Sequence, residues 1–513
     1  MWHYLGFLPV HTWVLFLLFL VLLLVYGYWP YDTFQKLGIP GPKPVLFFGN
    51  MLNYKKGFHN FDMECFHKYG KMWGIFDGRQ PILCTMDTEL IKTVMVKECY
   101  SYFTNRRNFG LNGPMYDAIF NAEDEDWRRI RSVLSPSFTS GRLKEMFGIM
   151  KSHSSNLVKS MRKDANVSKP SNTKEYFGAY SMDVVTSTAF SVDIDSLNNP
   201  KDPFVTHIKK MLKFDLLNPL LIIVLFFPFM TPVLERMGFA LFPLSVTDFF
   251  YASLKNIQAQ RETITPKKRV DFLQLMMDSQ STKARDNITG EEIHKGLNDH
   301  EILSQSLLFI FAGYETTSTT LNFLCYNLAT NPDTMKKLQD EIDEVFPDKS
   351  DVQYEPLMQM EYLDCVINET LRLYPPAARV DRVCKKTVDI RGVLIPKGMV
   401  VMAPTFPLQR DPDLWTDPDT FNPERFSKEN KDSIDPYSFL PFGIGPRNCL
   451  GMRFALVSMK LAIVELLQNF TLSTCAETEI PLELDTFGFM APKRSIKLQL
   501  VPRSSAAQPS PRG

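Results

Sequence analysis

Residues 1–31 contain no Asp, Glu, Lys or Arg, and this charge-free start constrains the chain more than any other feature of its sequence. Within it, the apolar run from Trp13 to Trp29 approaches the roughly 20 residues that a helix needs to span a bilayer. Aromatic rings lie at both ends of the run, where they favour the headgroup layer. A signal peptide would need a basic start and a small-residue cleavage site, and neither is present. We therefore expect a transmembrane anchor over residues 1–31.

The first lysines set the expected orientation of this anchor. Lys36, Lys43, Lys55 and Lys56 all follow the apolar run. By the positive-inside rule, the N-terminus then faces the lumen and the body of the protein lies in the cytosol. Residues 32–45 contain the sequence Pro-Gly-Pro-Lys-Pro, whose prolines fix φ and prevent a helix from continuing. We expect this segment to form a stiff hinge between the anchor and the body.

The rest of the chain has the composition of one large globular domain. The sequence is 45% hydrophobic over 513 residues, and no Ser/Gly linker or fixed-period repeat divides residues 46–500. Its 57 basic residues balance 57 acidic ones, so no global field attracts polyanions and we expect no nucleic-acid partner. Eight irregularly spaced Cys favour neither a zinc cluster nor a disulfide framework. Residues 501–513 are small, polar and Pro-rich, which predicts a disordered tail.

Hydrophobic periodicity predicts a mainly α fold with small β-sheets. Amphipathic helices are expected near residues 60–70, 126–134, 142–163, 251–262, 299–330, 333–346, 360–373 and 452–468. Short strands separated by turn residues are expected over 74–86 and 388–401.

The segment 216–234 departs from this soluble pattern. It is apolar and has no charged residue, yet Pro219, Pro228 and Pro232 interrupt it and would leave backbone groups unsatisfied in lipid. We expect a pair of surface helices that dips into the bilayer, and the alternative is a segment buried in the core.

The chemistry is concentrated around Cys449. The loop before it and the helix expected after it place this Cys at a helix N-terminus, whose partial positive charge favours the thiolate that a metal requires. Gly445 and Gly451 would let the backbone approach a flat cofactor, and Arg447 could pair with a carboxylate on it. A thiolate also donates electron density to haem iron. An isolated Cys is usually a buried small hydrophobe, but the full spacing Phe-x-x-Gly-x-Arg-x-Cys-x-Gly, which starts at Phe442, favours a ligand.

At these residues the sequence resembles the cytochrome P-450 family of haem-thiolate monooxygenases. Glu369 and Arg372 match the family's Glu-x-x-Arg pair, and Arg425 in Pro-Glu-Arg-Phe matches the arginine that completes its triad. The resemblance implies the cytochrome P-450 fold, a single large haem domain behind an N-terminal transmembrane anchor, in which the triad braces the Cys loop. It also implies haem b as the cofactor, with Cys449 as the axial ligand of its iron.

A further family motif, Ala-Gly-Tyr-Glu-Thr-Thr, lies in the long helix expected over 299–330. Gly313 weakens a helix, and the hydroxyls of Thr316 and Thr317 can bond back to the preceding turn, so these residues predict a local distortion. In the family this distortion is the oxygen groove, where the threonine and its acidic neighbour deliver protons. By this resemblance, Thr316 and Glu315 are the catalytic residues.

The resemblance narrows to the vertebrate microsomal third family, subfamily A, on segments that include 103–107, 134–141 and 309–315. It implies that the haem propionates are held by Arg106, Trp127, Arg131, Arg382 and Arg447. It places around the substrate pocket Ile119, Phe120, Phe311, Ala312, Ala377 and Ala378. Phe120 stands where relatives often carry a small polar residue and Pro376 where they carry an aliphatic one, so the resemblance leaves substrate preference open.

The resemblance also implies an activity and partners. It points to an NADPH-dependent monooxygenase of the endoplasmic reticulum (microsomal) membrane that hydroxylates lipophilic substrates, such as steroids and xenobiotics, with O2. Electrons would come from NADPH through the flavoprotein NADPH-cytochrome reductase, with cytochrome b5 as a candidate second partner. The residues that could dock an acidic partner are Arg128, Arg129, Arg131, Arg453 and Lys460, and a solvated basic face is the alternative.

Two other functions compete with this one. A peroxide isomerase of the thromboxane-synthase type would need no external electrons, and its relatives lack the hydroxyl that Thr316 supplies. A haem or sterol carrier without turnover would need neither a thiolate ligand nor a Glu-Thr pair. Consumption of NADPH and formation of an NADPH-dependent product distinguish the monooxygenase from both.

Overall fold

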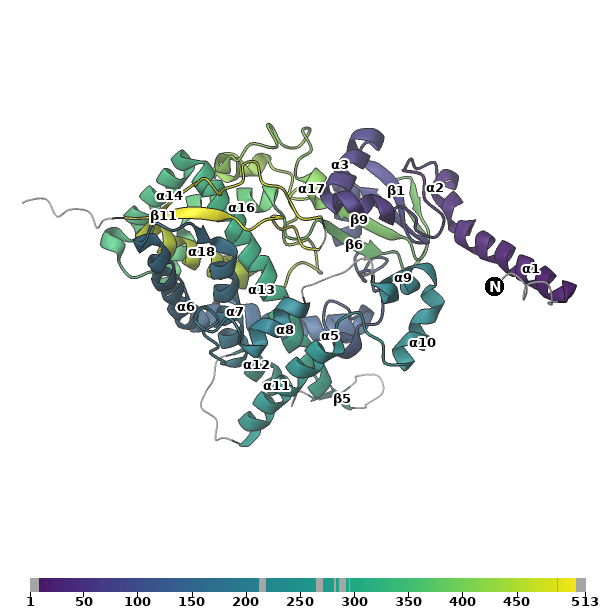
Figure 1. Ribbon diagram of the computed structural model, residues 1–513, viewed down its shortest axis with the longest axis horizontal. Coiled ribbons are helices and arrows are strands. Elements are labelled where there is room, and N and C mark those ends of the chain that lie inside the picture. Colours follow the sequence, from purple (N-terminus) through teal and green to yellow (C-terminus); the bar gives the residue numbers. More distant parts are fainter. Residues whose placement is uncertain are drawn as a thin grey trace, which may run out of the picture.

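Most of the described chain is helical, and the strands form small sheets (Figure 1). The computed structural model describes residues 9–211, 218–263, 271–280, 283–285, 292–294, 296–486 and 488–503. The expectation of a mainly α fold with small β-sheets is confirmed.

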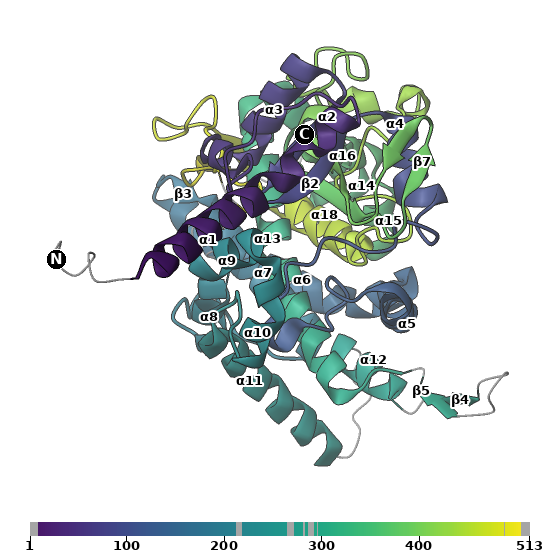
Figure 2. The same cartoon turned by 90° about the vertical axis from the view of Figure 1, so that its right-hand side faces the viewer.

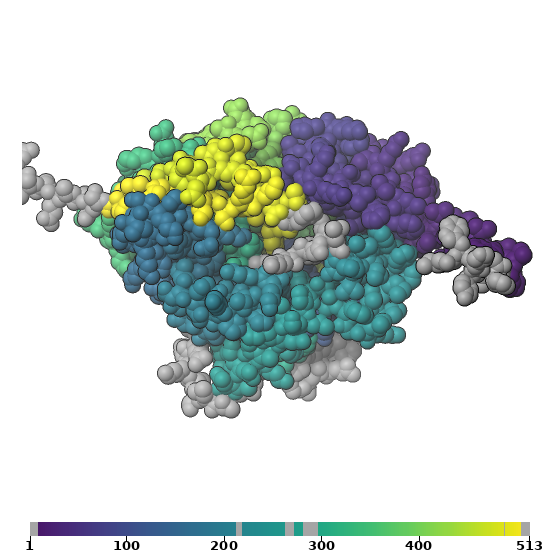
Figure 3. Space-filling model, viewed as in Figure 1, coloured from purple at the N-terminus to yellow at the C-terminus, as the bar shows by residue number. Residues whose placement is uncertain are grey.

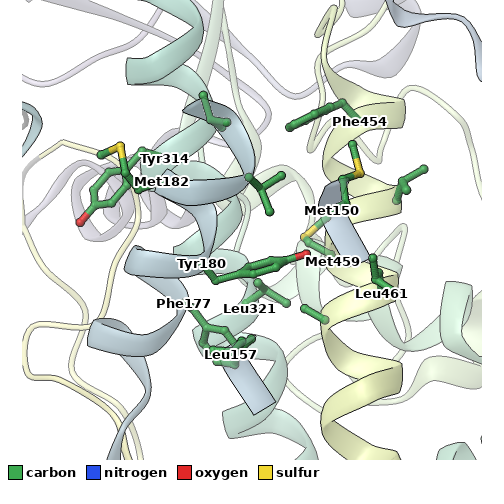
Figure 4. Close-up of a cluster of buried hydrophobic side chains, with 14 of the residues drawn as sticks. Met150, Leu157, Phe177, Tyr180, Met182, Tyr314, Leu321, Phe454, Met459 and Leu461 are labelled. Atoms are coloured by element: carbon green, nitrogen blue, oxygen red, sulfur yellow. The ribbon is translucent and has the colours of Figure 1, made fainter. Parts of the chain in front are cut away.

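Four long helices form the centre of the fold. They are α6 (Ser140–Asn166), α7 (Thr173–Phe190), α13 (Asp299–Thr330) and α18 (Met452–Asn469). Their facing sides are apolar, and Figure 4 shows side chains such as Leu157, Phe177 and Leu461 packed between them. Tyr180 also lies in this core, and its hydroxyl donates to the Ser458 carbonyl at 2.9 Å, so its polar end is satisfied.

The remaining helices of the domain surround this centre. They are α3 (Phe58–Tyr69), α4 (Thr88–Lys92), α5 (Asp124–Leu134), α8 (Pro203–Met211), α11 (Leu244–Thr263), α12 (Phe272–Ser279), α14 (Pro332–Val345), α15 (Tyr354–Gln359), α16 (Glu361–Leu373) and α17 (Thr405–Leu408). Each stretch expected to be an amphipathic helix is helical. The sequence did not predict α7, because nearly all of its residues are buried and it therefore has no polar face to set a period.

The largest sheet has the strand order β1, β2, β9, β6. β1 (Met72–Asp77) and β2 (Gln80–Thr85) form a hairpin, β9 (Val400–Pro404) runs parallel to β2, and β6 (Arg379–Val383) runs antiparallel to β9. This register pairs Arg382 with Val401 and buries the Arg382 side chain. α11 and α12 lie across the helical centre from this sheet (Figure 1, Figure 2).

Smaller strands complete the described structure. β7 (Val388–Ile390) pairs with β8 (Val393–Ile395), and β4 (Lys283–Arg285) pairs with β5 (Glu292–His294). A three-stranded sheet joins β3 (Ser171–Asn172), β11 (Lys497–Pro502) and β10 (Phe470–Ser473). The expected start of the disordered tail at residue 501 is therefore wrong, because Val501 pairs with Thr471 in this sheet. Residues 504–513 of that predicted tail lie outside the described residues.

The apolar N-terminal run forms α1 (Val10–Tyr28). In the described part of the chain, the helical run Val10–Lys36 is long and apolar enough to cross a membrane, and only 6% of its most apolar window is buried. The segment expected to be a hinge packs on the domain. A Cβ atom at Gly74 would lie 2.2 Å from the ring of Phe34, so a glycine in β1 makes room for that buried ring.

Within the apolar segment 216–234, the structure describes the residues from 218 onward, and they form a bent pair of helices. Residues 216–217 lie outside the described residues. α9 (Pro219–Phe226) and the helical turns Pro228–Arg236, which end in α10 (Thr231–Arg236), meet at an angle of 113°. The prolines thus break the segment as expected, and two helices form. Their inner side is buried, since Leu221 is 2% exposed, whereas Phe229 is 63% exposed and Val233 47%.

This helix pair lies beside the C-terminal end of α1. The Tyr26 hydroxyl donates to the Phe226 carbonyl at 3.1 Å, and the Tyr26 ring stacks on Phe227 with centroids 5.9 Å apart. Figure 3 shows the N-terminal segment and the α9–α10 region at the same end of the molecule. The exposed apolar side chains of both segments therefore share one end of the protein.

A buried ion pair lies at the end of α16. Glu369 and Arg372 are both fully buried, and the Arg372 Nε donates to Glu369 Oε2 at 2.7 Å. Arg425 in the turn Pro423–Phe426 lies 3.3 Å from the same carboxylate. Arg372 also donates to the carbonyl of Gln409, whose side-chain oxygen accepts from the Leu440 N–H at 2.9 Å. The triad is thereby linked to the start of the loop that carries Cys449.

We expect Glu369→Gln to destabilise the protein by about 3–5 kcal/mol, because it leaves the Arg372 charge buried without its counter-ion. A thermal melt of the purified protein measures the loss. Asp340→Asn is the matched control, since Asp340 and Lys336 form an exposed ion pair one helical turn apart. The control should cost less than about 1 kcal/mol. Equal melting temperatures for the two variants would contradict this account.

Candidate functional site

Cys449 lies in a tight loop directly before α18. Gly443 and Gly445 adopt positive φ angles of 66° and 75°, which bend the loop back on itself. The Cys449 N–H donates to the Phe442 carbonyl at 2.8 Å, and the Asn448 N–H donates to the Gly445 carbonyl at 3.0 Å. The loop is therefore held by its own backbone, with Cys449 just before the start of the helix.

Gly445 makes a close contact with another part of the protein, which the sequence did not predict. A Cβ atom at Gly445 would lie 2.1 Å from the carbonyl oxygen of Met95, so this glycine lets the loop touch the backbone of a neighbouring segment. At Gly451 the nearest atom to such a Cβ is a Phe138 ring carbon at 3.9 Å. Gly445 is therefore required by packing within the protein, and the expectation that Gly445 and Gly451 let the backbone approach a flat cofactor stays a prediction.

Cys449 differs from the other cysteines in its accessibility. All eight cysteines lie in the described residues and are free thiols. Six of them are buried, Cys475 is half-buried and Cys449 is exposed. Protein nevertheless surrounds Cys449 at longer range, and this burial raises the pKa of its thiol more than the Gly451 backbone hydrogen bond lowers it. The net shift is opposite to the one expected from the helix N-terminus, because desolvation outweighs the Gly451 hydrogen bond and the positive charges of Arg106 and Arg131. A metal cation that displaces the thiol proton removes this penalty.

The structure brings the predicted propionate-binding residues together around this loop. Arg131 on α5 donates to the Asn448 carbonyl and to Asn448 Oδ1, both at 2.7 Å. Arg106 donates to the Arg447 carbonyl at 2.9 Å. The Arg447 guanidinium lies 4.3 Å from the centroid of the Trp127 ring. The loop is thus held by arginines from two distant segments of the chain.

These arginines form a cluster of positive charge. In the described part of the chain, no ion pair joins Arg106, Arg131, Arg382 or Arg447 to a carboxylate. The pKa of Arg447 is lowered to about 9 and that of Arg382 to about 10. Burial is the larger cause in both cases, and the positive charge of the neighbouring Arg106 is the second. Arg382 Nε and Nη2 and Arg447 Nε are buried nitrogens without a hydrogen-bond acceptor in the structure. Buried donors of this kind indicate that the cluster is built to face an anion.

One side of α13 is open in the middle of the helix. Every residue from 317 to 329 is buried, yet Ala312 is exposed, and Leu308 and Thr316, one turn away on the same side, are partly exposed. The Thr316 hydroxyl donates to the Ala312 carbonyl at 2.7 Å, as the sequence indicated. Since that bond uses its hydrogen, the Thr316 oxygen keeps its lone pairs as acceptors on the open side.

The expected distortion at Gly313 does not interrupt α13, which is helical without a break from Asp299 to Thr330. The glycine has another role. A Cβ atom at Gly313 would lie 2.5 Å from a methyl carbon of Val185 on α7. The absence of a side chain therefore allows α7 and α13 to pack closely.

Glu315 contacts α7. Its carboxylate pairs with Lys174 and accepts from the Thr319 hydroxyl at 3.3 Å. Glu315 and Thr316 are adjacent in the sequence, but their side chains have different hydrogen-bond partners in the structure. Lys174 was not predicted as part of this arrangement, because its position in the first turn of α7 carries no local signal of a contact with α13.

The predicted pocket residues come from three separate segments. Phe311 contacts the Phe242 and Phe489 rings, with centroids about 6 Å apart in each case. Phe489 was missed in the sequence because its C-terminal loop carries no motif. Phe120 is 50% exposed, and its ring centroid lies 5.1 Å from the Arg106 guanidinium carbon. Ala377 is exposed and Ala378 half-buried, just before β6.

The basic face expected from the sequence is smaller than predicted. Lys460 is 1% exposed and pairs with Asp364 at 2.8 Å. Arg129 pairs with the nearly buried Glu301, and Arg131 holds the Cys loop. The expectation that all five residues face solvent was wrong, because helix periodicity alone does not show which side packs inward. Arg453 is exposed and Arg128 is partly exposed.

Comparison with known proteins identifies the class to which this fold and site belong. The sequence profile of the family Cytochrome P450 matches residues 39–500. The chain therefore belongs to the cytochrome P450 family. Cytochrome P450 3A40 of Oryzias latipes is 66% identical over 501 residues, which cover 98% of this chain and 99% of that protein. Cytochrome P450 3A29 of Sus scrofa is 56% identical over 498 residues, which cover 97% and 98%. The resemblance to the third family, subfamily A, is confirmed.

The residues present fit the haem that this family implies. A haem offers an iron ion for one thiolate and two carboxylates for a cluster of cationic donors. Cys449 is the exposed thiol, and the unpartnered nitrogens of Arg382 and Arg447 lie in the arginine cluster beside its loop.

We expect Cys449→Ser to retain haem weakly at most and to lose the red-shifted Soret band that a ferrous carbonyl complex shows with a thiolate ligand. Cys475→Ser is the matched control, because Cys475 is the next most accessible thiol. This variant should keep the band. Absorption spectra of the reduced, CO-treated proteins measure the difference. If Cys449→Ser kept the band, another residue would have to be the iron ligand.

Proposed function

We propose that this chain is a membrane-bound haem-thiolate monooxygenase that hydroxylates lipophilic substrates, such as steroids and xenobiotics, with O2 and electrons derived from NADPH. The observation that carries the proposal is the juxtaposition of one exposed thiol, Cys449, with an arginine cluster in which Arg382 and Arg447 are buried and which has no ion-pair partner among the described residues. When bound, haem supplies the activation of O2 and the transfer of one oxygen atom to carbon.

The residues of the chain divide the work of holding this group. Cys449 would bind the haem iron, and the backbone hydrogen bonds of its loop hold the residue in place before α18. Arg106, Arg131, Arg382 and Arg447, with Trp127, hold the propionates. Because Arg131 and Arg106 also bond the backbone of residues 447 and 448, the same side chains position the ligand loop and the carboxylates. The residues that would hold the haem are thereby ordered by contacts within the protein.

Thr316 and Glu315 handle protons. The Thr316 hydroxyl donates to the Ala312 carbonyl, so its oxygen can accept a hydrogen bond from a proton donor on the open side of α13. For a relay, the hydroxyl turns away from that carbonyl, gives its own hydrogen to the acceptor on the open side and takes up the donor's proton in exchange. Glu315 is held by Lys174 and Thr319. Release of that ion pair would let the carboxylate carry protons from the α7 side toward Thr316.

The substrate pocket is apolar. Its proposed wall consists of Ile119, Phe120, Phe311, Ala312, Ala377 and Ala378, and Phe242 and Phe489 extend it. Apolar walls of this kind bind ligands through buried surface area and with few polar contacts. The small alanines leave room for bulky molecules.

The electron donor would be NADPH-cytochrome reductase, with cytochrome b5 as a second candidate. An open hollow of about 670 Å³ lies between α5 and the Cys loop, lined by Tyr100, Trp127, Arg128, Arg131, Ser132 and Pro446. Its guanidinium groups give it a positive character that suits an acidic protein surface. The proposed route for electrons therefore enters on the thiolate side.

The proposed location is the endoplasmic reticulum membrane, with the catalytic domain in the cytosol. α1 supports an anchor, and the exposed apolar side chains of Phe229, Val233 and Met237, in and beside α10, support a second contact with the same membrane. The contact of Tyr26 with Phe226 and Phe227 holds the two together.

An isomerase and a carrier remain the alternative functions, and Thr316→Ala tests the monooxygenase against both. The variant should bind substrate and accept electrons almost normally, yet yield hydrogen peroxide in place of hydroxylated product, because protons no longer arrive through the Thr316 oxygen. We expect the share of NADPH converted to product to fall by about tenfold or more. NADPH consumed, peroxide formed and product formed are measured in parallel.

Thr320→Ala is the control for this experiment, since Thr320 lies one turn further along α13 and is buried. Its coupling should match that of the wild type. Equal coupling in Thr316→Ala and wild type would show that water or Thr317 relays the proton. Absence of any NADPH-dependent product from the wild type would favour the isomerase.

The membrane contacts can be separated by truncation. Removal of residues 1–24 spares Tyr26 and should leave a haem-loaded protein that still partly sediments with lipid vesicles. Additional serine substitutions at Phe229, Val233 and Met237 should release it, because these side chains are exposed. Leu221 is unsuitable for this test because it is buried. Serine at the exposed residues Val167 and Leu394 is the control and should not release the protein. Full solubility after truncation alone would rule out the second contact.

A further inference from the structure

The loop 113–122 carries two proposed pocket residues, Ile119 and Phe120, and is bound to α13 along its length. The Ser304 hydroxyl donates to the Pro114 carbonyl at 3.0 Å. His300 Nδ1 lies 2.7 Å from Asp117 Oδ2, and the His300 ring stacks on Tyr116. These contacts lie at the outer part of the loop, where His300 and Asp117 are partly exposed.

The inner part of the loop is held by one side chain. Gln305 Nε2 donates to the Asp117 carbonyl at 2.9 Å, and Gln305 Oε1 accepts from the Ile119 N–H at 2.7 Å. Gln305 is fully buried, and so is Ala118, the residue between its two backbone partners. A single amide group thus closes a ring over Ala118 and fixes the backbone on both sides of it.

The geometry requires a glutamine at this position. A carboxylate in place of the amide has no hydrogen to donate to the Asp117 carbonyl, and an asparagine is one methylene too short. An apolar side chain of the same length would leave both backbone groups buried without partners. The residue is therefore matched to the loop by both its length and its two-sided hydrogen bonding.

The other end of the loop is tied to the proposed haem site. Arg447 Nη2 donates to the Ala122 carbonyl at 2.7 Å. Phe120 consequently lies between two anchored backbone groups, the Ile119 N–H on Gln305 and the Ala122 carbonyl on Arg447. Its ring is half exposed, and Arg106 lies over it at 5.1 Å. The direction of the ring is thus set by where these two anchors place the backbone.

We propose that Gln305 is a positioning residue for substrate selection, which fixes Ile119 and Phe120 as one wall of the pocket and so decides which carbon of a large substrate meets the oxidising centre. The inference rests on the proposed monooxygenase function. It concerns the wall alone, because Gln305 contacts neither the Cys loop nor the arginine cluster in the bonds that it makes.

The test compares Gln305→Leu and Gln305→Glu with the wild type, using testosterone as a substrate with several oxidisable positions. In Gln305→Leu we expect the ratio of hydroxylated isomers to change at least about fivefold and the spectrally measured Kd of testosterone to rise by a similar factor. Binding of imidazole, a small iron ligand that need not touch the wall, should stay within about twofold. Gln305→Glu keeps the bond from Ile119 and should show a smaller change in the same direction.

Ser304→Ala is the matched control, because it removes a neighbouring bond between α13 and the same loop but leaves Ile119 held. Its isomer ratio should equal that of the wild type even if its melting temperature falls. Hydrogen exchange of residues 114–122 provides a readout that needs no turnover, and Gln305→Leu should increase it.

The outcomes separate this inference from the function on which it rests. An unchanged isomer ratio and Kd in Gln305→Leu would overturn it, and Gln305→Glu decides the matter if the leucine variant fails to fold. An equal change of the isomer ratio in Ser304→Ala would also overturn it, since the effect would then be general loosening of the loop. If the wild type forms no product, the monooxygenase proposal fails, while the Kd and exchange measurements still report on the wall.

Discussion

The positive charge of the arginine cluster around the Cys449 loop is the constraint on which the site depends. Burial and mutual repulsion lower the pKa values of Arg382 and Arg447, so the cluster is costly in isolation. The cost is offset partly by the backbone carbonyls of residues 447 and 448, which accept from Arg106 and Arg131. An anionic cofactor would complete the compensation. The chain thus couples cofactor binding to the order of the loop that carries its proposed iron ligand.

The braces of this loop extend through the fold. The buried pair of Glu369 and Arg372 bonds Gln409, and Gln409 in turn accepts from Leu440 at the start of the loop. Arg447 continues in the other direction, to the carbonyl of Ala122. The proposed haem site and the wall of the proposed pocket are therefore linked by one hydrogen bond, from Arg447 to the Ala122 carbonyl.

The apolar end of the molecule is organised around the same domain. The end of α9 and the turn after it contact α1 through Tyr26, and a carbonyl of α9 lies near Gly78 in the turn between β1 and β2. A side chain at Gly78 would lie 2.7 Å from the Leu225 carbonyl oxygen. The helix pair is thus seated on the sheet that carries Arg382. The proposed membrane contact and the proposed cofactor site are thus connected through this small sheet.

The sequence alone determined the elements with a local signal. The charge-free start predicted α1, periodicity predicted the amphipathic helices, and the spacing around Cys449 and Thr316 indicated a haem-thiolate protein of the cytochrome P450 family. It could not give the contacts between distant segments. Gly313 makes room for Val185, Gly445 for Met95, and Glu315 pairs with Lys174, because tertiary packing brings α7 and other segments to these positions. Likewise, no motif in the sequence singles out Gln305. Only the fold brings its side-chain oxygen to the Ile119 N–H, since hydrogen bonds between segments depend on distances that no local pattern encodes.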